Sequence, residues 1–326
     1  TPDLFYIKIG NGPQGEWDCK AEEDWEMATA VARRYGCKLQ LIDLQKEYWD
    51  EVVGYIVDRL RKGLTPNSDV MCNKYIKFGC FEEREGHNYD RIATGHYAQT
   101  ETDEAGRVWL TTAPDPIKDQ TDFLAQLDGF SVRKLIFPIG GLMKDEVRKI
   151  AQAAHLAPAK RKDSQGICFL GKISFSELAR KYLGEKEGLV VEQETGNIIG
   201  KHKGYWFYTI GQRKGLGIAA PEPLYVIALD SAENRVIVGS SEAVYAQELI
   251  ASDPRWTMWE ELREERTVQA KIRYGKREAA ATVVPEGVYV RVRFAEPQRA
   301  VTPGQSVVFY ENDILLGGGI IDRVIA

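Results

Sequence analysis

The sequence predicts an α/β fold in which a Rossmann-like parallel sheet precedes a small β-rich central domain and a C-terminal β-barrel. Near the N-terminus, apolar strand-like runs at 4–10 and 38–44 alternate with amphipathic helical segments at 20–35 and 47–61. This order is typical of parallel strands joined by helical crossovers. Beyond residue 172 short strand patterns separated by glycines replace it. The domains are expected to span residues 1–171, 172–248 and 249–326.

The remaining elements of the first two domains follow from the same periodicities. We expect a strand at 91–93, a hairpin at 101–111, and helices at 119–127, 144–154 and 175–183. The central domain is expected to hold strands at 189–193, 197–204, 205–211, 224–230 and 235–240. Residues 205–208 form an aromatic cluster, which suits either a base-stacking platform or the core of the small domain.

The last domain reads as all-β. Apolar and polar residues alternate strictly at 268–272 and at 288–294, which indicates half-buried strands. We expect Gly317–Gly319 to permit a tight bend. A small β-barrel is the closure expected for such short strands.

Composition and charge narrow the class of protein. The 326 residues are 44% hydrophobic and 28% charged, which is typical of a soluble globular protein. No apolar run approaches the roughly 18 residues of a membrane span, and no secretory signal pattern opens the chain, so we expect a cytoplasmic protein without membrane association. The five cysteines have no zinc-like spacing, and no metal ligands are predicted. A net charge of −5 disfavours nonspecific polyanion binding over the whole surface but permits a locally basic face.

A cysteine follows a run of turn-forming residues in the stretch LTPNSDVMCNKYIKFGCF, residues 64–81. The residues from Pro66 to Asp69 predict a loop that ends at Cys72, after which apolar residues recur at helical spacing. The loop would place a carboxylate and a thiol three residues apart at a helix N-terminus, where partial positive charge favours the thiolate. The alternative is a buried structural cysteine.

A second charged loop, AKRKDSQGICFL at residues 159–170, also ends near a cysteine. Cys168 follows Lys160, Arg161 and Lys162, and such an electropositive neighbourhood lowers the pKa of a thiol. Two loops of this kind suggest a pair of thiols brought together in space.

The motifs TPNSDVMCNKYIKFG, ATGHYA, KDQTDFL and KDSQGICF, in this order, resemble those of the tRNA-specific 2-thiouridylases of the ATP-pyrophosphatase (PP-loop) superfamily. The resemblance continues through GQRKGLG, TPGQSVVFY and LGGGII, so it covers nearly the whole chain. It implies a PP-loop type of parallel sheet and a tRNA-uridine 2-sulfurtransferase. The implied reaction is ATP-dependent 2-thiolation of the wobble uridine U34, through adenylation of its C2 oxygen and sulfur transfer from a cysteine persulfide. The implied partners are tRNA and a sulfur-relay persulfide donor protein; Mg²⁺ is expected with ATP, at no identifiable site.

The resemblance also implies roles for the two cysteines and the loop between 67 and 69. Cys72 matches the family's nucleophile and Cys168 its persulfide carrier; attack of one on the other would release sulfide or form a disulfide. Asn67, Ser68 and Asp69 match the segment that meets the target base, with Ser68 where the family has proline. Asp69 would act as an acid or base or would hold the uridine edge; the alternative is an ordinary turn aspartate.

Binding residues are carried over in the same way. Gly95 and Ile7 match nucleotide positions of the family. The positions that match tRNA contacts are His96, Lys118, Asp119, Gln120, Arg273, Tyr274 and Gln305. Asp119 could instead be only a helix cap, and His96, a lone histidine after a strand, could instead be structural.

The family's opening strand and Gly-rich SGGxDS phosphate loop have no counterpart in the sequence, which begins at what resembles the second strand. Either the sequence omits an N-terminal segment that the protein has, or the chain has lost the loop. The first explanation is favoured, because a parallel sheet without its central strand exposes apolar neighbours and backbone groups that lack partners. Two other functions stay open: a catalytically inactive tRNA-binding protein, and an ATP-pyrophosphatase that adenylates a small metabolite.

Overall fold

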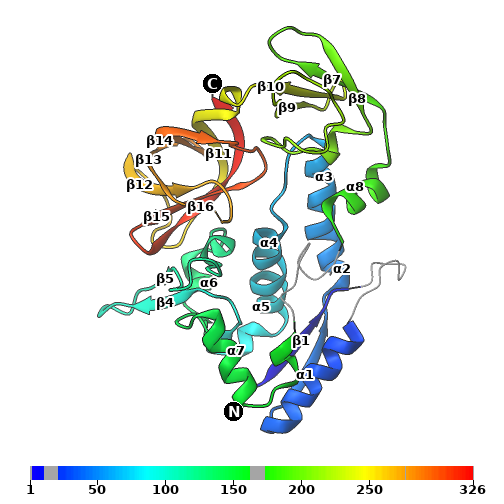
Figure 1. Cartoon of the computed structure of the whole chain (residues 1–326). Coiled ribbons are helices and arrows are strands. Elements are labelled where there is room, and N and C mark those ends of the chain that lie inside the picture. Colours follow the sequence, from blue (N-terminus) through cyan, green and yellow to red (C-terminus); the bar gives the residue numbers. More distant parts are fainter. Residues whose placement is uncertain (1, 11–20, 162–172, 276, 326) are drawn as a thin grey trace. The chain divides into compact units, whose positions relative to one another are not determined.

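The computed structural model describes residues 2–10, 21–161, 173–275 and 277–325, which form two compact units (Figure 1). The first unit is drawn from residues 1–54, 68–124 and 130–174, and the second from 55–67, 125–129 and 175–326. The first unit is α/β and the second is mostly β, as the sequence predicts.

The first unit opens with the predicted strand, helix and strand. Strands β1 (Leu4–Lys8) and β2 (Leu39–Asp43) are parallel, and α1 (Ala21–Tyr35) is the helix between them in the sequence (Figure 1). Acidic residues occupy the first turn of α1 and arginines its last, which suits the helix dipole. Gly36, at φ 64°, follows the helix in the left-handed conformation that ends many helices.

Two long helical runs follow, each with a π-helical middle. The first consists of α2 (Gln45–Glu47), η1 (Tyr48–Val53) and α3 (Gly54–Arg61), close to the predicted helix at 47–61. The second consists of α4 (Ser68–Met71), η2 (Cys72–Cys80) and α5 (Phe81–Arg84), followed by the 3₁₀ turn η3 (Gly86–Asn88). The predicted loop up to Cys72 is therefore wrong, since the helix begins at Ser68. Asn, Ser and Asp are favoured at helix N-termini as well as in turns, and here they begin a helix.

The rest of the first unit contains a second parallel pair, β3 (Ile92–Ala93) with β6 (Leu135–Ile136). The hairpin of β4 (Gln99–Thr102) and β5 (Val108–Thr111) is confirmed. The predicted helix at 119–127 is wrong: only the 3₁₀ turn η4 (Thr121–Leu124) forms, in which Phe123 N–H bonds to the Gln120 carbonyl three residues back. The remaining helices are α6 (Gly129–Val132), the predicted α7 (Lys144–Ala153), and η5 (Ala157–Lys160).

The second unit begins with α8 (Phe175–Leu183) and a four-stranded sheet of order β8-β7-β10-β9. Its strands are β7 (Gly188–Glu192), β8 (Ile198–His202), β9 (Tyr225–Asp230) and β10 (Arg235–Gly239), and the 3₁₀ turn η7 (Glu242–Val244) follows. The predicted strand at 205–211 is wrong, because residues 205–207 form the 3₁₀ turn η6 (Tyr205–Phe207). Tyr205 is 4% exposed and belongs to the core of this sheet, so the aromatic cluster supplies core packing.

The C-terminal strands close into a barrel. They are β11 (Tyr245–Trp256), β12 (Arg266–Lys271), β13 (Ala279–Glu286), β14 (Tyr289–Arg299), β15 (Ser306–Glu311) and β16 (Ile314–Ile325). The order is β11-β14-β13-β12-β15-β16, and β16 pairs back onto β11. Val290, Val292 and Phe294 point into the core as the alternation predicts.

The predicted bend at Gly317–Gly319 is wrong, since these glycines lie inside β16. A Cβ on Gly317, whose φ is 147°, would lie 2.0 Å from the carbonyl oxygen of Arg255. Close approach of neighbouring strands, rather than a turn, therefore requires glycine there. Among the described residues, no helix is long and apolar enough to cross a membrane.

Candidate active site

Cys72 begins the π-helical stretch η2, one turn inside the helical run that starts at Ser68. Its side chain is 0% exposed, whereas Asp69, three residues earlier in the first turn, is half-buried. Residues three apart on a helix are neighbours, so the predicted carboxylate and thiol share one end of this helix. Cys168 and Lys162 lie outside the described residues.

Asn73, the residue after Cys72, joins the helix to two other segments of the first unit. Its amide nitrogen donates to the carbonyl oxygen of Phe123 at 3.2 Å, and its Oδ1 lies 3.1 Å from Nε2 of His96. Asn73 is only 2% exposed. Its contacts therefore hold the helix that carries Cys72 against the segment after β3 and against η4.

The direction of these hydrogen bonds fixes the state of His96. A backbone carbonyl can only accept, so the Asn73 amide group donates to Phe123 and its Oδ1 must accept from His96 Nε2. His96 Nδ1 is then the acceptor for the Thr94 hydroxyl at 2.7 Å. Burial, and secondarily the charge of Lys77, lowers the pKa of His96 to about 3. His96 is therefore a neutral imidazole with its proton on Nε2.

Gly95 lies between the two bonded side chains of Thr94 and His96, just beyond the carboxyl end of β3. Its backbone is exposed, and an added Cβ would lie 4.0 Å from Ile139 Cδ1, an ordinary van der Waals distance. Ligands of parallel sheets bind beyond the carboxyl ends of the strands, and this position leaves room for one. Ile7, the other predicted nucleotide residue, lies on β1 opposite Ile42.

Hydrogen bonds join the predicted segment 118–120 to Tyr97, the residue after His96. Gln120 N–H donates to the Tyr97 carbonyl at 2.8 Å, and its side-chain Oε1 accepts from Tyr97 N–H at 3.1 Å. Asp119 is 8% exposed and its Oδ1 accepts from Ala113 N–H at 3.0 Å and from the Thr121 hydroxyl at 2.6 Å. Lys118 is half-buried. Asp119 and Gln120 thus organise this loop.

Asp115, which the sequence analysis did not select, anchors the same loop. One carboxylate oxygen accepts from Ile117 and Lys118 N–H, and the other accepts from the first N–H of α7, at Lys144, at 3.0 Å. The bond from Lys144 N–H is the main reason that the pKa of Asp115 is lowered. A capping carboxylate 29 residues before its helix gives no local sequence signal, which explains why it was missed.

The remaining predicted residues belong to the second unit. Gln305 donates from Nε2 to the carbonyl oxygens of Thr65 at 3.0 Å and Pro66 at 3.2 Å, directly before Asn67 in the chain. Arg273 is half-buried, and its pKa is lowered by burial and by repulsion from Arg299. Tyr274 beside it is 45% exposed.

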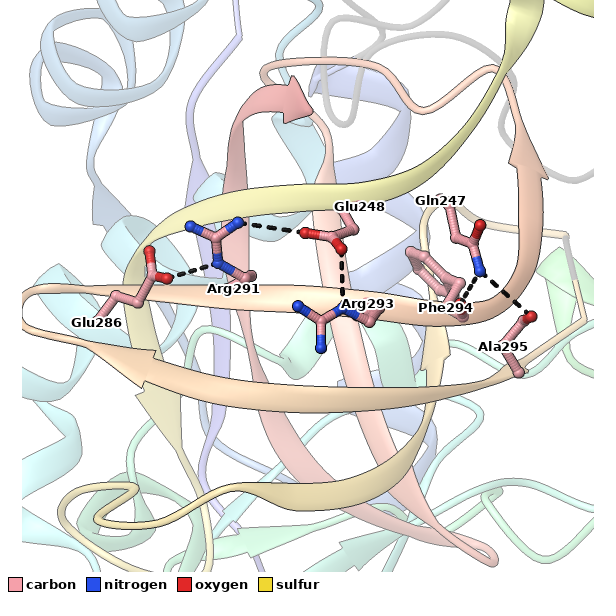
Figure 2. A network of polar contacts seen from close by, with 7 residues as sticks. All are labelled: Gln247, Glu248, Glu286, Arg291, Arg293, Phe294 and Ala295. Carbon is pink, nitrogen blue, oxygen red and sulfur yellow. Dashed lines mark hydrogen bonds and ion pairs between the residues drawn. The ribbon is translucent and has the colours of Figure 1, made fainter. Parts of the chain in front are cut away.

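The outer face of the barrel also carries a charge network between β11 and β14, drawn in Figure 2. Glu248 accepts from Arg291 at 3.2 Å and from Arg293 at 2.7 Å, and Glu286 accepts from Arg291 at 2.5 Å (Figure 2). The hydrogen bonds from Arg293 and then Arg291 lower the pKa of Glu248. These arginines are matched by carboxylates, so they join strands and offer little net positive charge to an anion.

Three known domain families together match most of the chain. Residues 6–172 match the tRNA methyl transferase HUP domain, residues 176–240 the tRNA methyl transferase PRC-barrel domain, and residues 246–321 the aminomethyltransferase beta-barrel domain. A HUP-type α/β domain followed by two β-rich domains is the class of protein that the fold and these matches define.

Curated relatives narrow the class to one family. The chain is 50% identical to tRNA-specific 2-thiouridylase MnmA 1 of Bacteroides thetaiotaomicron over 99% of this chain and 93% of the relative. It is 48% identical to tRNA-specific 2-thiouridylase MnmA of Parabacteroides distasonis over 98% of this chain and 91% of the relative, and 45% identical to that of Enterococcus faecalis over 94% and 84%. The chain therefore belongs to the tRNA-specific 2-thiouridylase family, a family of tRNA sulfurtransferases. The predicted family, fold class and enzyme class are confirmed.

Proposed function

We propose that this chain catalyses ATP-dependent 2-thiolation of the wobble uridine U34 of tRNA. The observation that carries the proposal is its identity of 50% to a 2-thiouridylase over 99% of the chain, which spans all three matched domains. We propose boundaries of 1–171, 172–248 and 249–326 for these domains, and the matched ranges support them.

The first step in this proposal activates the base. The C2 oxygen of uridine forms a bond to the α-phosphorus of ATP and pyrophosphate leaves, so that a poor leaving group becomes a good one. We assign Gly95 and Ile7 to the nucleotide; the exposed, uncrowded backbone of Gly95 supports its part. Asn67, Ser68 and Asp69 are assigned to the target base, with Asp69 as the acid/base or positioning group.

The second step replaces oxygen by sulfur. A persulfide donor protein of a sulfur relay loads Cys168, and the Cys72 thiolate attacks the Cys168 sulfur. A disulfide between them forms while hydrosulfide leaves; hydrosulfide adds to C2, and AMP departs. A thiol reductant then returns two electrons to the disulfide. The match of Cys72 to the family's nucleophile in TPNSDVMCNKYIKFG supports this role.

We assign direct tRNA contacts to Lys118, Gln120, Arg273, Tyr274 and Gln305, whereas His96 and Asp119 are carried over as residues of the tRNA-binding motifs without a direct contact. An arginine beside an exposed tyrosine suits phosphate binding with stacking, which supports Arg273 and Tyr274. His96 and Asp119 are buried in the first unit, which favours an indirect role for both. A cytoplasmic location is part of the proposal.

Mg²⁺ is expected with ATP. Within the described part of the chain, no group of three or more His, Cys, Asp or Glu side chains could hold a metal ion. No residue is therefore assigned to magnesium, and no step is drawn through it.

The test incubates the purified chain with an unmodified tRNA transcript, ATP, Mg²⁺ and sulfide, and measures 2-thiouridine in the digested tRNA by mass spectrometry. The proposal predicts ATP-dependent 2-thiouridine in a transcript with U34 and none in a transcript with C34. Binding of tRNA without ATP-dependent product would show the inactive binding protein instead.

A further inference from the structure

The hydrogen bonds around His96 link the two halves of the candidate site by a short path. Gly95, assigned to the nucleotide, is followed by His96; His96 bonds Asn73; and Asn73 is followed by Cys72, assigned as the nucleophile. Thr94 closes the path on the other side of Gly95 by its bond to His96 Nδ1. The path lies wholly in the first unit.

We propose that Asn73 and Thr94 are positioning residues that, through His96, hold the Cys72 turn of the helix and the Gly95 segment in one fixed arrangement. The proposal rests on the function proposed above and deepens it. It makes the imidazole an internal brace, in place of the direct tRNA contact that the resemblance implies.

Each hydrogen bond of the brace requires one particular donor and one particular acceptor. The Phe123 carbonyl orients the Asn73 amide, the amide oxygen then requires a proton on His96 Nε2, and the lone pair at Nδ1 then requires a donor, which Thr94 supplies. The ring also lies between Phe78 and Phe137, at centroid distances of 6.0 and 5.8 Å. Packing and hydrogen bonds thus leave the ring one orientation.

A brace of this kind has a definite kinetic consequence. Sulfur transfer needs the adenylated base and Cys72 in register, and a displacement of about 1 Å can reduce a rate roughly 100-fold. Loss of the brace should therefore lower kcat, while KM for tRNA should change little, because no direct tRNA contact is removed.

Thr94 offers a matched pair of variants. Thr94→Val keeps the shape of the side chain but removes the donor to Nδ1, whereas Thr94→Ser keeps a hydroxyl. We expect kcat of Thr94→Val to fall at least about 10-fold, and that of Thr94→Ser to stay within about 3-fold of wild type. Thr257→Val is the control, since Thr257 is a buried threonine in the second unit whose hydroxyl donates to Leu315. It should leave kcat unchanged.

Asn73→Ala tests the other link without tRNA or a sulfur donor. The alkylation rate of Cys72 by iodoacetamide, followed by peptide mass spectrometry, reports how tightly its turn of helix is held. The side chain is 0% exposed, so wild type and Thr257→Val should react slowly, and Asn73→Ala at least about 10-fold faster.

The outcomes separate the brace from the proposed function. Lower kcat in Thr94→Val with rescue in Thr94→Ser, and faster alkylation of Asn73→Ala, support the brace. A raised KM for tRNA at unchanged kcat in Thr94→Val overturns it and favours direct contact. If the wild-type chain forms no 2-thiouridine, the proposed function fails, and alkylation alone then decides: equal rates in Asn73→Ala and wild type reject the brace.

Discussion

The Nε2 atom of Gln305 lies 3.0 Å from the carbonyl oxygen of Thr65, so the barrel holds the segment that leads into Asn67. The same nitrogen donates to Pro66 at 3.2 Å, and Thr65 N–H donates to the Pro303 carbonyl at 2.9 Å. Gly304, at φ 93°, allows the approach, because a Cβ there would lie 2.8 Å from Thr65 N. These hydrogen bonds fix the backbone of Thr65 and Pro66, directly before the residues assigned to the target base.

Replacing Gln305 should therefore affect more than RNA affinity. Gln305→Glu keeps the shape but turns a donor into an acceptor facing two carbonyl oxygens, so we expect a lower melting temperature and a loss of kcat of about 10-fold. Gln298→Glu is the control, since half-buried Gln298 donates its side-chain N–H to the carbonyl of Glu296, two residues away in the same strand. Weaker tRNA binding at unchanged kcat and stability would instead show that Gln305 acts by touching tRNA.

Gly95→Ala tests the nucleotide assignment. Among the residues that the structure describes, the added methyl meets only Ile139, at 4.0 Å, so the melting temperature should stay unchanged. If ATP approaches this backbone closely, its Kd should rise about 10-fold or more, measured by calorimetry. Gly140→Ala is the structural contrast: its methyl would lie 1.7 Å from the Ala98 carbonyl oxygen, so that variant should be destabilised. Unaltered ATP affinity in a folded Gly95→Ala protein would remove Gly95 from the nucleotide site.

Substitution of Arg273, with substitution of Arg293 as the control, tests whether the barrel contacts RNA. Arg293 is paired with Glu248 at 2.7 Å (Figure 2), whereas Arg273 faces the repulsion of Arg299. Arg273→Ala should weaken tRNA binding and reduce the slope of log K against log salt by about 1, as expected for one lost phosphate contact. Arg293→Ala should leave the slope unchanged. Equal slopes for wild type and Arg273→Ala would contradict a phosphate contact.

The buried His96 predicts a pH dependence of stability. Its pKa is about 3 in the folded protein and about 6.5 when exposed, so between these values the unfolded chain binds the extra proton. Stability from this group is complete above pH 6.5 and is lost as pH falls; at pH 5.5 the loss is about 1.4 kcal/mol. Urea unfolding of wild type and His96→Gln at pH 7.5 and 5.5 measures it. An equal pH dependence in both proteins would contradict a neutral, buried imidazole.

Local periodicity predicted much of the fold. The strands near 4–10 and 38–44, the helices at 20–35, 144–154 and 175–183, and the alternating barrel strands all form. The predictions were wrong where the same residue types are common in two different local structures. Residues 67–69 suit a turn or a helix start, and residues 317–319 suit a bend or a crowded strand. At Gly317 the approach of Arg255, distant in the sequence, decides for the crowded strand.

The candidate site likewise contains residues that the sequence identified and residues that it did not. The sequence selected Cys72, Gly95 and His96 through motifs, but not Asn73, Thr94 or Asp115. Asn73 and His96 are 23 residues apart, and their bond exists only once the helix packs against the segment after β3. Hydrogen-bond partners of buried polar groups are set by tertiary packing, which composition and spacing do not reveal.

The most direct test of the proposed function is 2-thiouridine formation by Cys72→Ser beside Cys80→Ser, with tRNA affinity measured for both. The two cysteines begin and end the same π-helical stretch, so Cys80→Ser controls for a lost thiol in that segment. We expect no 2-thiouridine from Cys72→Ser, normal product from Cys80→Ser, and tRNA Kd within about 3-fold of wild type for both. An active Cys72→Ser would contradict the assignment of Cys72 as nucleophile.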